Sequence, residues 1–298
     1  MPKKTAETQQ VATQALSIKV PKFEDFYREA SKYSPNSKTT FEPFRFSIIR
    51  QGKSGAVLEH KSKGDITLPN PFQAVLLYTN NKLECRCTLA ANTKTLICRS
   101  PNRRHSISGN LCSECPYKTK DANGNMVANP KYQIRTLKNY YLMPIVDNEM
   151  YFARFKTTVP NITKLLELSD NVTAHLKDFN IKDYPQAVVE VKIKKFQENN
   201  NDVYRPDSTD FEIVNVLEDG SWNDLKEFMD KLIKYEADRY ESNTRYVAAK
   251  YAEVSAALPK AATPSAVAKP AAVVASADVE APEAPDVVCE GEEDDLPF

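Results

Sequence analysis

Alternating apolar and polar residues predict five main strands. Their approximate ranges are 72–79, 132–146, 149–158, 187–197 and 210–217. In the fourth range, Val189 and Val191 face one way while Lys192 faces the other, which is the two-residue period of a half-buried strand. Asp147-Asn148 separates the second range from the third and predicts a tight hairpin turn between them.

A longer period predicts two helices. Pro160 opens the first, roughly 161–179, whose leucines recur on one broad side. Ser221 is suited to cap the second, which runs to about Leu258 and carries the only tryptophan. Strand, hairpin, helix, strand, strand is the element order of an OB-fold. We therefore expect a mainly β chain of the α+β class, with an OB-fold-like five-stranded barrel and a long C-terminal helix.

Composition divides the chain into a folded core and three flanking parts. Residues 1–20 are rich in Lys, Thr, Gln and Ala and predict a disordered arm, whereas 21–258 contain the core with an insertion at 82–120. Residues 259–288 are rich in Ala, Pro and Val, which is typical of a flexible linker, and 289–298 form an acidic tip. No apolar run reaches transmembrane length and no signal-peptide pattern is present, so we expect a cytoplasmic protein that does not enter a membrane.

The formal net charge of +0 conceals an uneven distribution of charge. Residues 271–298 contain nine acidic residues and no Lys or Arg, so the remainder has 40 basic against 40 − 9 = 31 acidic residues, a balance of +9. A basic body with an acidic tail suggests that the body binds polyanions.

Five of the six cysteines lie within 31 residues. Cys112 and Cys115 form a C-x-x-C pair, in which one turn can supply two ligands of a tetrahedral zinc ion. Residues 82–90 and 94–100 predict two strands around a turn at Ala91-Asn92, which would set Cys85 opposite Cys98. We predict one structural Zn²⁺ ion held by four thiolates, Cys85, Cys98, Cys112 and Cys115.

The first ligand of this zinc site has two alternatives. Cys87 lies on the same strand face as Cys85, and His105 stands midway between Cys98 and Cys112. A redox role for the C-x-x-C pair would require a strand-to-helix setting that the pattern does not predict. A set of buried thiols without metal is the alternative to a zinc site.

Basic and aromatic residues are interleaved in the insertion and in the hairpin after it. Proteins that bind single strands regardless of sequence stack bases on aromatic rings and contact phosphates with Lys and Arg. The candidate nucleic-acid-binding residues are Arg99, Arg103, Arg104, Lys131, Tyr132, Arg135, Tyr140, Phe152, Arg154 and Lys156. In the returning strand we expect Phe152, Arg154 and Lys156 to form the binding face, with the alternate residues in the core.

The chain ends in a run of carboxylates followed by a short apolar tip. The last residues resemble the acidic tip of single-stranded DNA-binding proteins, whose chains end in an Asp run, an apolar residue, Pro and Phe. The resemblance implies that this tip recruits a polymerase, helicase or primase. The residues that carry it are Asp294, Asp295, Leu296, Pro297 and Phe298.

The cysteine spacing also resembles the zinc module in the single-stranded DNA-binding proteins of large tailed phages. In those proteins a His is the first ligand, whereas this chain has Cys85 in that place. Both resemblances imply a non-enzymatic protein that binds single-stranded DNA in replication, recombination and repair, with self-association on DNA as a further expectation.

Two other functions fit the same features. One is a zinc-ribbon nuclease or primase-like enzyme, whose Mg²⁺ would require clustered carboxylates such as Asp207, Asp210 and Glu212. The other is a zinc-ribbon accessory factor of transcription or recombination, which would prefer a duplex or an RNA polymerase to a bare strand.

Overall fold

The computed structural model describes residues 15–29, 39–49, 55–79, 82–93, 95–178, 186–198 and 201–257. These residues form two compact units. Of the described residues, the first unit contains those up to Cys85 together with Arg135–Asn243, and the second contains Arg86–Ile134 and 244–257. The predicted linker at 259–288 and the acidic tip lie outside the described residues.

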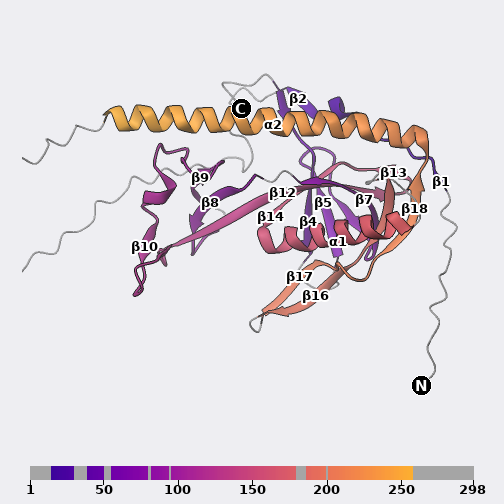
Figure 1. Cartoon of the computed structure of the whole chain (residues 1–298), viewed down its shortest axis with the longest axis horizontal. Helices are drawn as coiled ribbons and strands as arrows, with labels where there is room; N and C mark the ends of the chain where they lie inside the picture. Colours follow the sequence, from indigo (N-terminus) through magenta and orange to yellow (C-terminus); the bar gives the residue numbers. More distant parts are fainter. Residues whose placement is uncertain are drawn as a thin grey trace, which may run out of the picture. The chain divides into compact units, whose positions relative to one another are not determined.

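The first unit is built on one large sheet. The bounds of its strands are β1 (Ala15–Leu16), β4 (Phe44–Ile49), β5 (Gly55–Glu59), β6 (Ile66–Leu68), β7 (Phe72–Thr79), β12 (Tyr132–Val146), β14 (Ala153–Thr158), β15 (Ala187–Val191) and β18 (Glu212–Leu217). Neighbouring strands follow the order β1-β18-β15-β7-β12-β14-β4-β5-β6 (Figure 1). Most pairings are antiparallel, and β14 with β4 and β1 with β18 are parallel.

Smaller elements complete the first unit. They are η1 (Phe23–Phe26), β2 (Tyr27–Glu29), β3 (Thr39–Phe41), β13 (Glu149–Met150), β16 (Ile193–Glu198) and β17 (Asn201–Pro206). β2 pairs with β3, β16 pairs with β17, and β13 pairs with the end of β12.

Two helices among the described residues, α1 (Val159–Asp178) and α2 (Asp219–Ala257), border different cores. Neither helix has the apolar stretch that a bilayer crossing requires. Tyr140 packs in the core that contains Leu165 and Leu168 of α1, whereas the next residue, Tyr141, packs in the core that contains Phe228 of α2. Because successive side chains of a strand point to opposite faces, β12 is buried on both. This explains the continuous apolar run from Tyr140 to Val146 in the second half of the strand.

The second unit contains a strand pair, a short turn of helix and a separate hairpin. Their bounds are β8 (Glu84–Leu89), β9 (Leu96–Ser100), η2 (Cys112–Glu114), β10 (Lys118–Lys120) and β11 (Met126–Ala128). β8 pairs with β9 and with β12, and β10 pairs with β11. The division between the units falls within three elements, β8, β12 and α2, each of which has residues in both.

The α+β class is confirmed, and the five predicted strands and both predicted helices are present near their expected bounds. The five strands lie in one sheet in the order β18-β15-β7-β12-β14. The predicted strand at 187–197 is interrupted at Lys192. Beyond that point the chain pairs with β17, in a hairpin that the sequence pattern did not predict.

The prediction of a disordered arm over residues 1–20 is wrong from residue 15 onward. Leu16 pairs with Leu217, and Ile18 and Val20 are buried against the α2 side of the sheet. The Ser221 hydroxyl donates to the Ile18 carbonyl at 2.8 Å and accepts from the Ile18 amide at 3.0 Å. The segment is ordered because it adds an edge strand and two apolar side chains to an existing core.

A charged cluster lies between the sheet and α2 in the first unit. The Arg239 guanidinium contacts Glu84 and Glu236, each at 3.5 Å, and the Tyr141 hydroxyl donates to Glu236 at 2.7 Å. Lys156 contacts the other oxygen of Glu84 at 3.0 Å. Burial alone would lower the pKa of Arg239, but Glu236, Tyr141 and Glu84 outweigh it and raise the pKa. Arg239 therefore stays charged, and both carboxylates are held beside it.

We expect Arg239→Leu to lower the free energy of unfolding by about 3 kcal/mol, because it leaves Glu84 and Glu236 as buried carboxylates with less cationic compensation. Urea denaturation of the purified protein measures this change. Lys234→Leu, which replaces an exposed cation on the same helix, is the matched control and should change stability by less than about 0.5 kcal/mol. Equal effects of the two substitutions would contradict a structural role for the cluster.

Candidate functional site

Three of the predicted zinc ligands, Cys98, Cys112 and Cys115, belong to the second unit, and we call them the thiol cluster. Cys98 lies in β9, Cys112 begins η2, and all three are half-buried. Burial raises the pKa of the Cys98 thiol, hydrogen bonds from Ser106 and Ser108 lower it, and the nearby Cys112 and Cys115 raise it again, for a net upward shift. The largest cause of the shift is burial of the Cys98 side chain.

The loop between β9 and η2 is held by its own hydrogen bonds. The Asn102 side-chain oxygen accepts from the backbone amides of Arg104 and His105 at 2.9 and 3.0 Å. The Ser100 hydroxyl donates to the His105 carbonyl at 2.7 Å. The Cys112 amide donates to the Arg104 carbonyl at 2.8 Å, which brings the start of η2 back to the loop. These bonds position the C-x-x-C pair and expose Arg103 and Arg104.

The same loop packs on the last turns of α2, within the second unit. The His105 ring lies 5.0 Å from the Tyr251 ring. Gly109 has φ +78°, and a Cβ added there would be 2.6 Å from Cγ2 of Val254 and 3.1 Å from the Lys250 carbonyl. A glycine is required for two reasons, the left-handed backbone and the close approach of the helix.

Two tyrosines form an edge-to-face pair beside the thiol cluster. The rings of Tyr117 and Tyr132 are 5.0 Å apart, and both side chains are half-buried. Burial raises the pKa of Tyr117, with further contributions from Cys98, Cys87, Cys115 and Tyr132. Lys118 directly follows Tyr117 in the chain, and Lys131 directly precedes Tyr132. We call Tyr117 and Tyr132 the tyrosine pair.

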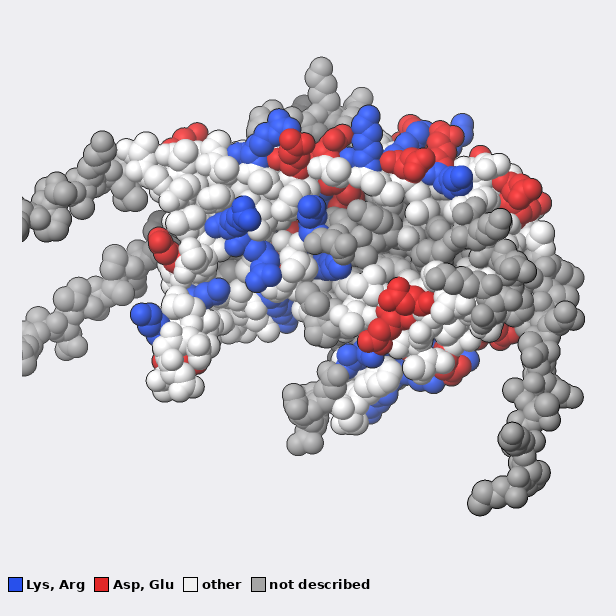
Figure 2. All heavy atoms as spheres, in the orientation of Figure 1, with Lys and Arg blue, Asp and Glu red and all other residues white. Residues whose placement is uncertain are grey.

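The second unit is strongly basic. Its described residues include nine Lys and Arg against three Asp and Glu, a balance of 9 − 3 = +6. Two of the acids are engaged locally, since Glu253 contacts Lys250 at 3.0 Å and Asp121 accepts hydrogen bonds within its own turn. Figure 2 shows Lys and Arg atoms gathered over β8 and β9, with few acidic atoms among them. The basic residues are Arg86, Arg99, Arg103, Arg104, Lys118, Lys120, Lys131, Arg245 and Lys250.

In the first unit, two predicted binding residues are core residues, and their assignment is wrong. Tyr140 is 2% exposed and shares a hydrogen bond of 2.6 Å with Ser169, and Phe152 is 0% exposed and packs against Phe228. Ala153 and Phe155, which were expected in the core, are buried as predicted. Alternation sorted the side chains into two faces correctly, but helices border the cores on both of them.

The remaining predicted residues of the first unit are accessible to different degrees. Arg135 is exposed on β12, and Arg154, which pairs with Tyr141 in the sheet, is half-buried. Lys156 is engaged with Glu84 in the charged cluster. Arg135 thus remains a candidate for contact with a polyanion, whereas Lys156 is already compensated by a carboxylate.

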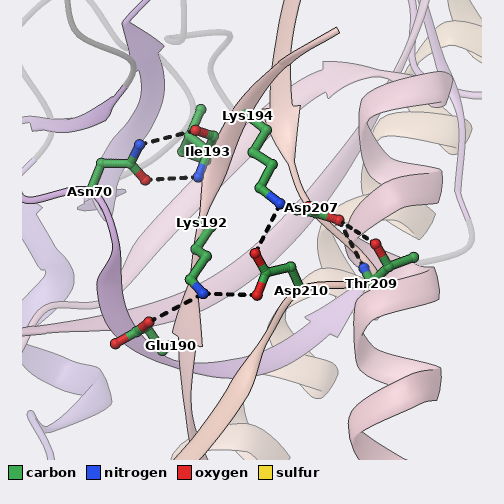
Figure 3. A network of polar contacts seen from close by, with 8 residues as sticks. All are labelled: Asn70, Glu190, Lys192, Ile193, Lys194, Asp207, Thr209 and Asp210. Carbon is green, nitrogen blue, oxygen red and sulfur yellow. Dashed lines mark hydrogen bonds and ion pairs between the residues drawn. The ribbon is translucent and has the colours of Figure 1, made fainter.

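Two of the three carboxylates predicted for a magnesium-dependent enzyme, Asp207 and Asp210, contact lysines (Figure 3), and the third, Glu212, is exposed. Lys194 contacts Asp207 at 2.6 Å and Asp210 at 2.9 Å, and Lys192 contacts Asp210 at 2.8 Å. Burial alone would raise the pKa of Asp207, but hydrogen bonds from Lys194 and Thr209 outweigh it and lower the pKa to about 2. The arrangement is a compensated ion cluster at the base of the β16–β17 hairpin.

Within the described ranges, no three His, Cys, Asp or Glu side chains are grouped closely enough to hold a metal ion. Cys85 belongs to the first unit, so its expected position opposite Cys98 stays a prediction. The predicted tip residues, Asp294 to Phe298, lie outside the described part of the chain.

Comparisons with protein families, with curated proteins and with solved structures find no match to this chain. The site must therefore be interpreted from its own residues. Sequence reasoning identified Tyr132 but missed Tyr117. The sequence did contain a sign of its position. Tyr117 is separated from Cys115 by a single proline, and Lys118 and Lys120 follow it.

We expect Gly109→Ala to lower the free energy of unfolding by about 2–3 kcal/mol, from backbone strain together with the clash against Val254. Gly124→Ala is the matched control, because Gly124 has φ +80° but a Cβ there would meet nothing within 4 Å. This control substitution should lower the free energy of unfolding by only about 1 kcal/mol. Denaturant titrations of both variants measure the difference, and equal losses would show that the loop does not pack on α2.

Proposed function

We propose that this chain is a sequence-independent single-stranded DNA-binding protein of DNA replication, recombination and repair. In this proposal the second unit contacts the DNA, and the acidic C-terminal tip recruits a polymerase, helicase or primase. The tip residues of the proposal are Asp294, Asp295, Leu296, Pro297 and Phe298.

One observation carries the proposal, namely the half-exposed tyrosine pair within a unit whose described residues have a balance of +6. A single strand offers phosphates at regular spacing and unpaired bases whose faces can stack. Rings and cations on one small unit match both features, and neither contact depends on base identity. Arg103, Arg104 and Lys131 are exposed and belong to the same unit.

The strand order of the first unit supports an OB-fold-like barrel as part of the proposal. In the order β18-β15-β7-β12-β14 the first predicted strand, β7, stands between the second and the fourth, and α1 connects the third to the fourth. Small barrels of this kind often bind single strands through one face and the adjoining loops. In this chain α1 and α2 pack on the sheet, so the proposal assigns DNA contact to the inserted unit.

A structural zinc ion is also part of the proposal. Cys98, Cys112 and Cys115 would supply three thiolates. The remaining ligand, which is the first in chain order if Cys85 or Cys87 supplies it, would be Cys85, Cys87 or His105. The chemistry of the residues fits zinc, since thiolates are among its preferred ligands and Cys98, Cys112 and Cys115 are half-buried thiols of one small unit. Cys87 is buried and belongs to the same unit as Cys98, Cys112 and Cys115.

The alternative of a nuclease or primase-like enzyme is less favoured. Its predicted magnesium ligands are Asp207, Asp210 and Glu212, and Lys192 and Lys194 already compensate the first two carboxylates. A transcription or recombination accessory factor would differ in preferring duplex DNA or an RNA polymerase. The binding experiment below distinguishes these alternatives from the proposed function.

We expect the full chain to bind oligo-dT with an affinity that falls steeply as salt rises, because bound Lys and Arg release counterions from the phosphates. Arg104→Gln with Lys131→Gln should weaken binding and reduce the logarithmic salt slope by about 1.4, at about 0.7 per lost contact. Tyr132→Leu should lower the affinity about tenfold through lost stacking. Fluorescence anisotropy of labelled oligo-dT measures these effects.

Lys195→Gln is the matched control for charge, because Lys195 is exposed in the first unit and contacts Asp202 at 2.6 Å. It should change the affinity for oligo-dT by less than about twofold, as expected of a cation outside the interface. Tighter binding to duplex DNA than to oligo-dT, or cleavage of DNA in magnesium, would reject the proposal in favour of one of the alternatives.

We expect about one zinc ion per purified chain, bound through thiolates. Cys112→Ser and Cys115→Ser should abolish bound zinc, as measured by elemental analysis, whereas Cys289→Ser in the C-terminal segment should leave it unchanged. Among Cys85→Ser, Cys87→Ser and His105→Asn, the variant that loses metal identifies the fourth ligand. A purified chain without zinc would remove the metal from the proposal but would leave the DNA-binding test intact.

A further inference from the structure

The β10–β11 hairpin of the second unit exposes apolar residues that pack in neither core. Met126 is 43% exposed and Val127 is 40% exposed. Figure 1 draws the hairpin as a narrow ribbon at the lower end of the second unit. Singly exposed apolar residues are common on protein surfaces, so what distinguishes this hairpin is the charge that lies beside them.

The register of the hairpin sorts its side chains into two different faces. Lys118 is opposite Ala128 and Lys120 is opposite Met126, whereas Thr119 is opposite Val127. Because directly opposed residues share a face, one face has two lysines on one strand and Met126 with Ala128 on the other. The opposite face has Val127 beside Thr119. The ribbon is therefore cationic along one strand and apolar along the other.

The tip of the hairpin is held in one conformation. The Asp121 carboxylate accepts from the amides of Asn123 and Asn125 at 2.9 and 2.8 Å, and the Asp121 amide donates to the Asn125 carbonyl at 2.9 Å. Gly124 supplies the left-handed residue that the turn requires. A two-stranded ribbon is marginal by itself, so these bonds preorganise its exposed side chains.

We propose that this hairpin is a wedge that binds the end of a DNA duplex at its junction with a single strand. The inference rests on the proposed function and adds a second substrate, the junction, to the bare strand. Its partner must be anionic and must also offer a flat apolar surface, and the terminal base pair of a duplex with its flanking phosphates offers both. Methionine and other apolar side chains are suited to insertion at base steps.

The roles within the wedge follow from the two faces. Met126, on the face that it shares with Lys118 and Lys120, would rest against the terminal pair and disturb its stacking. Val127 lies on the opposite face. Lys118 and Lys120 would contact phosphates beside the terminal pair. A bare strand lacks the terminal base pair, so Met126 should contribute to junction binding and the lysines to both substrates.

The test compares oligo-dT with a strand of equal single-stranded length that ends in a duplex, using the full chain. A fluorescent adenine analogue in the first base pair reports its unstacking. The full chain should bind the junction about fivefold more tightly than oligo-dT and should raise the fluorescence of the analogue. The double variant Met126→Gln with Val127→Thr, which nearly conserves side-chain shape, should lose both effects while retaining the affinity for oligo-dT.

Asn123→Ser at the tip is the matched control and should retain the junction preference, and circular dichroism with thermal unfolding should verify that all variants are folded. The wedge is rejected if the full chain binds oligo-dT but shows no junction preference. It is also rejected if the double variant weakens both substrates equally, or if its effect disappears when residues 290–298 are removed, since the acidic tip would then be the occupant. Failure to bind oligo-dT at all would instead reject the proposed function.

Discussion

The pairing of one buried cation constrains how the first unit is assembled. Arg239 cannot lose its proton, and its side chain is only 17% exposed, so the fold must keep carboxylates beside it. Glu84 of β8 and Glu236 of α2 meet this requirement, and Tyr141 of β12 binds Glu236 in turn. β8, β12 and α2 are also the three elements that continue into the second unit. The cluster therefore fixes the register of these elements in the first unit, where apolar packing alone would permit sliding.

The two units differ in how their basic and acidic residues are balanced, although the whole chain has a net charge of +0. In the first unit, lysines are repeatedly matched with carboxylates, as at Lys156 with Glu84 and Lys194 with Asp207. In the second unit the described acids are few, and two of the three are engaged in local contacts. A positive field is thus concentrated by the fold on a small unit, where it can attract a polyanion without a large net charge on the protein.

The success of sequence reasoning depended on how local the deciding interaction was. Strand β12 and helix α2 were predicted closely, since residue periodicity and adjacent turn or cap residues define them. Periodicity also placed Phe152 and Phe155 on opposite faces. It did not reveal that α2 packs on the Phe152 face, because that contact joins residues 76 apart, such as Phe152 and Phe228. The burial of Ile18 and Val20 was missed for a similar reason. A short apolar alternation at the start of a chain does not indicate which sheet edge it will join.

The cysteine segment shows the same limit from the functional side. The spacing of Cys112 and Cys115 predicts a metal-binding turn, because two ligands in one turn need no distant partner. The identity of the fourth ligand depends on which strand lies beside that turn, and spacing alone leaves Cys85, Cys87 and His105 open. Burial raises the pKa of Tyr117, Cys98 and Cys87 raise it further, and the ring pairs with Tyr132. In the proposed function, a metal ion bound at those thiols would also fix the ring on which a base is expected to stack, so that both proposed roles of the segment would depend on the same residues.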